Sequence, residues 1–492
     1  MIPVILCVML ISFAIILIWQ GIGSKKKKFP PGPIKLPILG NGALVKKYSH
    51  TYGGLHNAFH KMCEMYNTDI LGLKLGKDYV VVVQSESLIE EVFSREQFQA
   101  RPDTFFIRLR SMGTRKGITM TDGALWCEQR AFAVRHMHNL GLGKSQMEFL
   151  INEEMQILFS FLKNGLNVNL KNCISKCVLN VLWAMVTGSR FLNEDTLESL
   201  ISFMGQRAKA FDMAGGVLCQ FPWIRYIAPE WSGYNLIKKL NKQFKTMILD
   251  IIDKHKRTYD KEVTRDFIDA FLHEMYNNEN TDTSFTDDQL IMVCLDFFIA
   301  GSQTTSSTLD FALLQMIVFP HIQQKVHDEI DLVLEKRNPV LFSDKSKLPY
   351  VEAVLLESQR FSHIIPIIGP RRVLSTTTLG GYSIPKDTTI LLNLVPMLKD
   401  PKNWKDPNNF TPERFLNDDN QVIHDKFTYA FGKGKRRCPG EPLAKSFIFM
   451  FFTNFLKQYK IECVDKSNPP TLDYIPGLTL SPLPYEMKII KR

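Results

Sequence analysis

The sequence predicts a mainly α-helical protein with a minor antiparallel β-sheet region. Hydrophobic residues recur with helical periodicity from Leu88 to about Leu334. Short runs of β-branched and aliphatic residues lie outside this region on both sides. The chain has 492 residues, 45% of them hydrophobic and 22% charged, so it can bury a large core in one or two domains. Polar breaks divide the helical region near Gly141, Asn164, Pro229 and Asn277.

Residues 1–24 are expected to form a membrane anchor. The run from Pro3 to Trp19 is uncharged and almost wholly apolar, and it reaches Ile22 with small interruptions. As a helix it would be roughly 27 to 30 Å long, about the thickness of the hydrocarbon layer. A cleaved signal peptide is the alternative, but no basic region precedes the apolar run and no A-x-A-like site follows it.

Residues 25–37 combine a basic run with a proline-rich hinge. Lys25 to Lys28 follow the anchor, so the positive-inside rule places the body of the chain, residues 38–492, in the cytosol. The segment Phe29-Pro-Pro-Gly-Pro33 cannot continue a helix and makes a stiff, extended connection. Such a connection would hold the body at a set tilt on the membrane.

Charge and cysteine content narrow the class of partner and compartment. The formal charge of +10 and the pI near 9.0 suit an acidic partner, either anionic lipid or an acidic protein. No nucleic-acid-binding pattern accompanies the basic residues, so nucleic acid is not expected. Nine scattered cysteines form no disulfide framework and indicate a reducing compartment. We interpret Cys173 and Cys177 as small core residues, because no second pair stands at zinc-site spacing.

Three regions are expected to form strands. Ile70 to Val83 contains two β runs around a Gly-Lys-Asp turn, which predicts a hairpin. A second region covers Val373 to Ile384 and Thr388 to Val395, and a third lies near Ile475 to Ile490.

The segment from Phe211 to Ile227, FDMAGGVLCQFPWIRYI, is unusual within the helical region. Two glycines and a proline make it a poor helix, and exposing its many large apolar residues to water would cost free energy. We expect the membrane to cover it. A core-facing loop beneath other helices is the alternative.

A loop near the C-terminus, Phe431-Gly-Lys-Gly-Lys-Arg-Arg-Cys438-Pro-Gly440, has the composition that a buried thiolate needs. A thiolate removed from water is stabilised by nearby cations and backbone N–H groups, and glycines let the backbone wrap closely around one sulfur. Taken alone, a basic surface turn with an ordinary cysteine fits the loop equally well.

A long apolar helix, expected from about Asp287 to Val318, carries the stretch Asp296 to Thr305. Gly301 removes a side chain where a flat ligand could approach, and the Thr304 hydroxyl on the same face could hold water or a bound oxygen. The alternative is a packing glycine beside a threonine that bonds back to its own helix.

A charge cluster is expected before the cysteine loop. Glu357 and Arg360 stand three residues apart on a helix that begins near Pro349, which brings carboxylate and guanidinium together. Arg414, in an irregular Pro-Glu-Arg-Phe segment, could complete a cluster of three.

These segments, in this order, resemble a cytochrome P-450, a haem-thiolate monooxygenase of the membrane-anchored microsomal type. The cysteine loop fits the family pattern F-x-x-G-x-R-x-C-x-G at every fixed position. The resemblance covers essentially the full length, through the anchor, the hinge, Trp126 to Arg130, Ala300 to Thr305, Glu357 to Arg360, Pro412 to Phe415, and Phe431 to Gly440.

The resemblance implies a site for haem b in which the Cys438 thiolate is the axial ligand to iron. It also implies that Arg436 pairs with a haem propionate, with Phe431 beside the sulfur. The remaining residues implied at the propionate edge are Trp126, Arg130 and Arg371.

One position departs from the family pattern. The oxygen-activating segment usually carries an acid where this chain has Gln303. A carboxylate relays protons, whereas an amide only orients water, so proton delivery would depend on Thr304, water or the substrate. We interpret Asp296, two turns away, as structural.

The resemblance implies insertion of one oxygen atom from O2 into a lipophilic substrate, with electrons from NADPH. The chain has no nucleotide-binding G-x-G-x-x-G segment, so a separate NADPH-cytochrome reductase would supply them, with cytochrome b5 as a further candidate. The expected docking face consists of Lys433, Lys435 and Arg437 with Arg135. The location implied is the endoplasmic reticulum membrane.

The substrate pocket is expected to be apolar. The family's substrate-contacting segments fall at Phe105, Phe106, Phe211, Met213, Phe297 to Ala300, Ile364 to Ile367, Leu478 and Thr479. The sequence is similar in character to insect microsomal members, including enzymes that epoxidise a farnesoate ester in juvenile hormone synthesis. Epoxidation of a terpenoid ester is therefore the specific expectation, and hydroxylation of another lipid or a xenobiotic is the broad alternative.

Two other functions remain open at this point. A haem-thiolate isomerase or dehydratase would keep Cys438 but would need neither Thr304 nor a reductase. A membrane-bound lipid carrier would need neither Cys438 nor Arg436.

Overall fold

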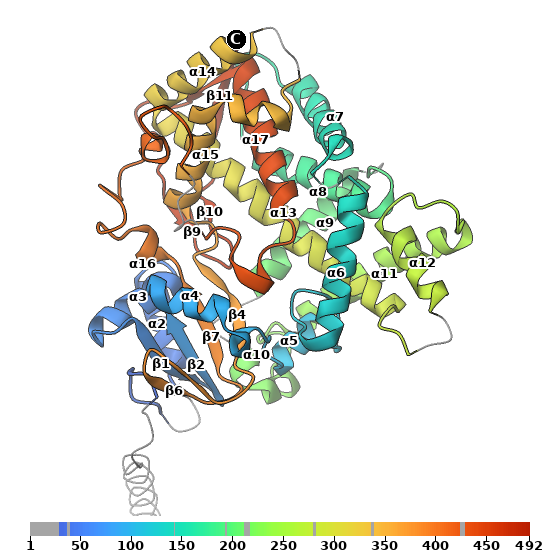
Figure 1. Cartoon of the computed structure of the whole chain (residues 1–492), viewed down its shortest axis with the longest axis vertical. Coiled ribbons are helices and arrows are strands. Elements are labelled where there is room, and N and C mark those ends of the chain that lie inside the picture. Colours follow the sequence, from blue (N-terminus) through green and yellow to red (C-terminus); the bar gives the residue numbers. More distant parts are fainter. Residues whose placement is uncertain are drawn as a thin grey trace, which may run out of the picture.

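The computed structural model describes residues 29–36, 40–141, 143–191, 194–210, 217–278, 282–335, 339–423 and 429–492. Helices dominate these residues, as predicted (Figure 1). The α-helices are α2 Gly42–Thr51, α3 Leu55–Met65, α4 Glu86–Ser94, α5 Phe105–Arg110, α6 Gly123–Asn139, α7 Ser145–Phe161, α8 Lys171–Thr187, α9 Glu194–Ala210, α10 Val217–Gln220, α11 Tyr234–Arg257, α12 Phe267–Asn277, α13 Asp287–Val318, α14 Pro320–Leu334, α15 Pro349–Ser362, α16 Val395–Leu398 and α17 Glu441–Gln458.

Short strands and 3-10 turns complete the description. The strands are β1 Ile70–Leu75, β2 Asp78–Val83, β3 Asn167–Val168, β4 Ile367–Arg372, β5 Thr377–Leu379, β6 Tyr382–Ile384, β7 Thr389–Asn393, β8 Tyr459–Cys463, β9 Tyr474–Ile475, β10 Ser481–Pro482 and β11 Met487–Lys491. The 3-10 turns are η1 Glu96–Phe98, η2 Pro222–Tyr226, η3 Phe342–Lys347, η4 Pro412–Phe415 and η5 Gly434–Arg436.

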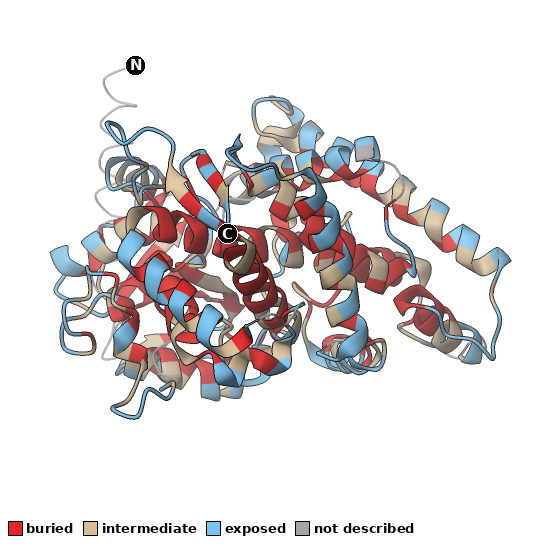
Figure 2. Cartoon of the chain, turned by 90° about the horizontal axis from the view of Figure 1, so that it is seen from above, coloured by how far each residue is buried: buried red, intermediate tan, exposed pale blue. Residues whose placement is uncertain are grey.

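Helix α13 runs through the middle of the molecule and organises the helical core (Figure 1). It is apolar around most of its circumference, which is the pattern of a helix enclosed by others. The Thr286 side chain caps its first turn by accepting a hydrogen bond from Gln289 N at 3.3 Å. Helices α8, α15 and α17 pack on it, and Figure 2 shows that buried residues gather in these central helices. The bounds of α13 and the start of α15 at Pro349 agree with the prediction.

The largest sheet has the strand order β1-β2-β7-β4. The predicted hairpin is present, with Ile70 opposite Val83. The expected antiparallel pairing is found in the other strand pairs described, but β2 and β7 run parallel. Strands joined by a short turn must run antiparallel, but β2 and β7 are far apart in the sequence and most of the helices lie between them. Such a long connection allows the two strands to run parallel. A bulge between Ile368 and Arg371 shifts the register of β4 against β7.

No helix among the residues described is long and apolar enough to cross a membrane. The predicted anchor and the lysine run, residues 1–28, lie outside the described residues.

The segment from Phe211 to Ile227 divides in two. Its first part, residues 211–216, lies outside the described residues. In the second part, Leu218 is buried with residues of α5 and α11, as a core-facing loop would be. Trp223 and Tyr226 instead have exposed fractions of 55% and 76%.

Candidate functional site

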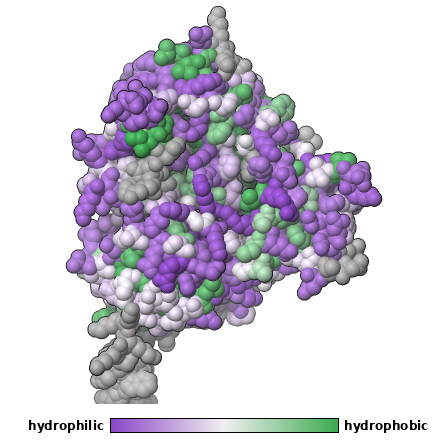
Figure 3. Space-filling model, in the orientation of Figure 1, coloured by the Kyte–Doolittle hydropathy of each residue, from purple (hydrophilic) through white to green (hydrophobic). Residues whose placement is uncertain are grey.

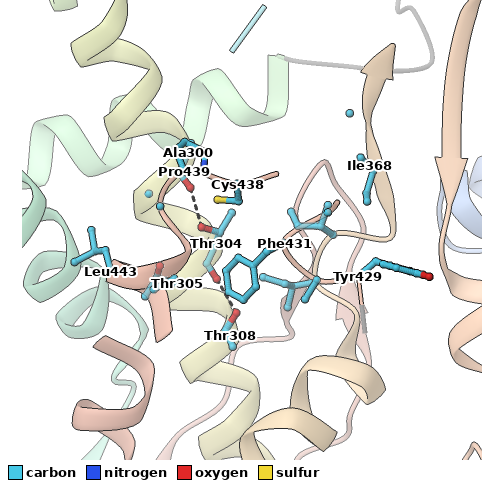
Figure 4. A pocket seen from close by; sticks show the side chains of 18 of the residues that line it. Ala300, Thr304, Thr305, Thr308, Ile368, Tyr429, Phe431, Cys438, Pro439 and Leu443 are labelled. Atoms are coloured by element: carbon cyan, nitrogen blue, oxygen red, sulfur yellow. Dashed lines mark hydrogen bonds between the residues drawn. The ribbon is translucent and has the colours of Figure 1, made fainter. Parts of the chain in front are cut away.

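A cavity of about 400 Å³ separates α13 from the cysteine loop. On one wall, α13 contributes Ala300, Gly301 and Thr304; on the other lie Phe431 and Cys438 (Figure 4). The lining is mainly apolar, and no acidic side chain belongs to it within the described part of the chain.

The glycines of the cysteine loop are required by its backbone. Gly432 and Gly434 have φ angles of 66° and 72°, in the left-handed region that favours glycine. A Cβ atom at Gly434 would also lie 2.7 Å from the carbonyl oxygen of Phe93, closer than atoms can approach. The resulting turn is closed by a hydrogen bond of 2.9 Å from Cys438 N to Phe431 O. It directs the Cys438 side chain into the cavity (Figure 4).

The surroundings of Cys438 favour its thiolate more than those of the buried Cys63 do. Burial raises the pKa of Cys438, while the backbone N–H groups of Gly440 and Glu441 and the charge of Arg130 lower it. Burial raises the pKa of Cys63 to about 12, with acids but no cation nearby. Cys438 opens onto the cavity, whereas Cys63 is enclosed in the core. Among the cysteines described, Cys438 is the one placed to bind a ligand in this cavity.

Three arginines line one edge of the cavity. Arg101, Arg371 and Arg436 all line it. Burial lowers the pKa of Arg371 to about 9 and that of Arg101 to about 10, and each of these two guanidinium groups is also near another arginine. The pKa of Arg436 is lowered to about 9 by burial and by the charge of Arg101.

The hydrogen bonds of these arginines leave donors unused. Arg436 Nε donates to Gln99 O at 2.9 Å, and Arg371 Nη1 donates to Gln99 Oε1 at 2.6 Å. Arg436 Nη1 and Arg371 Nε are buried without a hydrogen-bond partner. Burying a cation without a hydrogen-bond partner costs free energy. A ligand with carboxylate groups would stabilise this cluster.

Trp126 and Arg130, both on α6, support this cluster from one side. The Arg436 guanidinium lies 3.7 Å from the centroid of the Trp126 ring, a cation–π contact. Arg130 Nη2 donates to the Arg437 carbonyl oxygen and thereby fixes the cysteine loop to α6. The donor set, comprising one thiolate facing an apolar cavity and several arginines at its edge, fits haem b with its two propionates.

Thr304 and Gly301 lie where the sequence suggested, but each also has a packing role. Thr304 lines the cavity while its Oγ1 donates to Ala300 O at 2.7 Å, so the hydroxyl bonds back to its own helix. A Cβ atom at Gly301 would lie 2.8 Å from Leu182 Cδ2 of α8, so glycine allows α8 to pack closely. Gln303, on the same helix, does not line the cavity.

Asp296 has the structural surroundings expected of it. Its Oδ2 accepts hydrogen bonds from Ile118 N at 2.7 Å and Thr119 N at 2.8 Å. Its Oδ1 lies 3.5 Å from Arg110 Nη1. Asp296 therefore ties the segment before α6 to α13.

The predicted charge cluster is present and buried. Arg360 donates to both oxygens of Glu357, at 2.7 and 2.8 Å. Arg414 Nε donates to Glu357 Oε1 at 3.1 Å, and its Nη1 donates to Lys405 O at 2.7 Å. The segment that precedes the cysteine loop is thus bonded to α15.

Several predicted pocket residues take other positions. Phe297, Ile364 and Ile365 line the cavity, but Phe106 is buried in a separate cluster with α10 and α11. Phe211 and Met213 lie outside the described residues, and Phe105, Leu478 and Thr479 are absent from the lining. Sequence reasoning missed Arg101, which follows a 3-10 turn in an Ala-Arg-Pro stretch without any local motif.

The cations of the cysteine loop that are expected at a docking face each pair with a carboxylate. Lys433 Nζ lies 2.7 Å from Glu90 and Lys435 Nζ lies 2.7 Å from Glu96. Arg437 Nε lies 2.6 Å from Oε2 of Glu441, the first residue of α17. These side chains are more than half exposed, so the pairs are weak and can exchange for another anion.

Comparison with known proteins gives matches over nearly the whole chain. The family profile of cytochrome P450 matches residues 30–489. Probable cytochrome P450 305a1 of Drosophila melanogaster is 40% identical, over 99% of both chains. Farnesoate epoxidase of Bombyx mori is 36% identical, over 92% of both chains. Cytochrome P450 2J2 of Homo sapiens is 34% identical, over 94% of this chain and 91% of its own.

Proposed function

Because this chain belongs to the cytochrome P450 family, we propose that it is a haem-thiolate monooxygenase that epoxidises a terpenoid alkene. Members of this family bind haem through a cysteine thiolate and use O2, a redox partner and lipophilic substrates. The observation that carries the proposal is the meeting of Cys438 with three arginines around one apolar cavity, and two of these arginines have a buried donor without a hydrogen-bond partner.

Different residues of this chain would bind different parts of haem. When bound, haem supplies the oxygen activation, and the electron density of the thiolate assists cleavage of the O–O bond. Cys438 ligates the iron, while N–H groups and Arg130 stabilise its thiolate. Arg101, Arg371 and Arg436 neutralise the two propionates.

Proton delivery depends on α13. The Thr304 hydroxyl faces the cavity and donates to Ala300 O, an arrangement that can pass a proton once the bond is exchanged for one to water. Gln303 offers an amide where an acid is usual and does not line the cavity, so proton delivery depends on Thr304 and water.

An apolar, alkene-bearing substrate suits the lining. Phe297, Ala300, Ile364 and Ile365 offer no charge to the bound molecule. The likeness to a farnesoate epoxidase supports a terpenoid of that class. Hydroxylation of another lipid or a xenobiotic is the second candidate, because an apolar lining accepts such molecules as well.

We place the protein at the endoplasmic reticulum membrane, with an NADPH-dependent reductase as redox partner. Trp223 and Tyr226 are exposed on η2, and Ile34, in the hinge, has an exposed fraction of 80%. The start of α2, which follows the hinge, lies against the end of α10, which precedes η2, because a Cβ at Gly42 would meet the Gln220 side chain at 2.2 Å. Exposed apolar side chains on the hinge and on η2 suit a lipid bilayer.

The test is product analysis of the protein reconstituted with a reductase and NADPH. A panel containing terpenoid alkenes, fatty acids and xenobiotics should yield an epoxide from a terpenoid, dependent on NADPH. Conversion without NADPH would contradict a monooxygenase, and hydroxylated products alone would favour the second candidate.

A further inference from the structure

Helix α4 contacts the chain around the cysteine loop at two points. Glu90, in the middle of α4, accepts a hydrogen bond from the hydroxyl of Tyr429, two residues before the loop. Near the end of the same helix, the carbonyl oxygen of Phe93 lies against Gly434, where a Cβ atom would be 2.7 Å away. One helix thus holds the cysteine loop both at its entry and in its middle.

Tyr429 connects this helix to the haem cavity. The residue lines the cavity, while its hydroxyl is directed away from Cys438 (Figure 4). Only 5% of Tyr429 is exposed, and its ring packs against that of Phe93 with the centroids 5.6 Å apart. The tyrosine is therefore enclosed between α4 and the cavity, with its hydroxyl on the side of α4.

Glu90 binds two side chains of this region, and the two contacts differ in strength. Lys433 Nζ lies 2.7 Å from Oε1 and 3.0 Å from Oε2 of Glu90. The lysine side chain is 55% exposed, so this ion pair stabilises the loop little. The bond from Tyr429 comes from a buried residue and ends on a carboxylate, and hydrogen bonds to charged acceptors are the stronger kind. The contact with Tyr429 is therefore the one that holds the loop.

Two backbone hydrogen bonds carry this restraint from Tyr429 to Cys438. Gly432 N donates to Tyr429 O at 2.9 Å, which closes the turn that contains Phe431. Cys438 N donates in turn to Phe431 O at 2.9 Å. A shift of Tyr429 would therefore move backbone that is bonded directly to Cys438.

We propose that Glu90 is a positioning residue for the haem thiolate and acts through Tyr429. Its carboxylate holds the tyrosine in place and so keeps the loop in the conformation that directs Cys438 into the cavity. Arg130, which donates to the Arg437 carbonyl oxygen, holds the same loop from α6. This inference goes beyond the proposed function, because it rests on Cys438 as the haem ligand and does not depend on the substrate.

The test follows the absorption band of the reduced carbon monoxide complex, which reports thiolate ligation without turnover. Glu90→Ala removes the acceptor, and Tyr429→Phe removes the donor but keeps the ring. In each variant we expect the red-shifted band to be lost roughly tenfold faster on warming, because one charge-assisted hydrogen bond is absent. Glu90→Gln keeps an acceptor for the hydroxyl and should recover most of the lost stability. Tyr429→Phe keeps the test informative if Glu90→Ala does not fold.

Glu96→Ala is the matched control. Glu96 pairs with Lys435 of the same loop, but both side chains of that pair are exposed, so the rate should not change. The helical circular dichroism of all variants should be lost at the rate of the unsubstituted protein, which separates positioning from general destabilisation. Combining Glu90→Ala with Tyr429→Phe should add little to either change alone, because both remove the same bond.

Three results would overturn the inference: unchanged rates in both single variants, effects that add in full in the double variant, or loss of the band together with the circular dichroism. Unchanged rates in a protein that forms a terpenoid epoxide with NADPH would leave the proposed function intact. Tenfold faster loss of the band in Glu90→Ala, with no epoxide formed by the unsubstituted protein, would support the positioning role and contradict the proposed reaction.

Discussion

The neighbouring side chains of Arg436 and Arg437 in the cysteine loop have different contacts. Arg436 turns into the cavity and stacks on Trp126, whereas Arg437 turns outward to Glu441. The motif predicted a backbone wrapped closely around one cysteine, and the positive φ angles of Gly432 and Gly434 agree with that prediction. It did not predict Arg101, since that residue reaches the cluster only through the tertiary fold.

Arg436→Gln tests the division between these two arginines. Losing a charge-assisted hydrogen bond to a propionate costs about 1.5 to 3 kcal/mol, so haem affinity should fall roughly 10- to 100-fold. Haem transfer to an apo-globin acceptor measures this. Arg437→Gln removes the same charge from the next residue and should retain haem; equal losses in both variants would refute the assignment.

Thr304→Ala tests the role of the hydroxyl in proton delivery. Without it, we expect product formed per NADPH oxidised to fall roughly tenfold, with peroxide formed instead, because positioned proton transfer is lost. Thr304→Ser keeps the hydroxyl and should restore coupling. If the alanine variant is fully coupled, protons reach the site by another route.

At the scale of elements, the buried charge cluster fixes the irregular chain before the cysteine loop to α15. Sequence spacing alone predicted the contact of Glu357 with Arg360, since both lie on one helix. It also suggested Arg414, whose contact depends on the fold. The parallel pairing of β2 with β7 had no local signal, because nothing in either strand specifies a partner about 300 residues away.

Glu357→Gln should be severely destabilising. Arg360 is 1% exposed and would keep its charge without a carboxylate, a loss of about 3 to 5 kcal/mol. We expect little folded, haem-bound protein, measured by urea unfolding and haem absorbance. Glu413→Gln breaks an exposed pair with Lys325 nearby and should cost about 1 kcal/mol or less. Similar losses in the two variants would contradict the assignment.

At the scale of the whole molecule, charged and hydrophobic side chains lie on different parts of the surface. The face in Figure 3 is mainly hydrophilic, with hydrophobic side chains in scattered groups. The exposed aromatic residues of η2 follow α10, whose end lies against the start of α2. The order of segments along the sequence predicted the architecture, but it could not show that the basic residues of the cysteine loop pair with carboxylates from α4 and η1.

We expect an acidic reductase to replace the carboxylates that pair with Lys433 and Lys435, and this exchange can be tested. Lys433→Glu with Lys435→Glu should slow haem reduction about tenfold at low salt and leave haem content unchanged, because like charges then face an acidic partner. Stopped-flow reduction measures the rate. Lys245→Glu with Lys256→Glu changes the charge equally on α11 and should have no effect. Unchanged rates in the loop variant would place docking elsewhere.

The central claim is that Cys438 is the thiolate ligand of haem iron. The most direct measurement is the absorption spectrum of the reduced protein with carbon monoxide. We predict a red-shifted haem band in the unsubstituted protein and in Cys127→Ser, an exposed cysteine on α6, and its loss in Cys438→Ser. A red-shifted band that persists in Cys438→Ser, or an unsubstituted protein that binds no haem, would contradict the account.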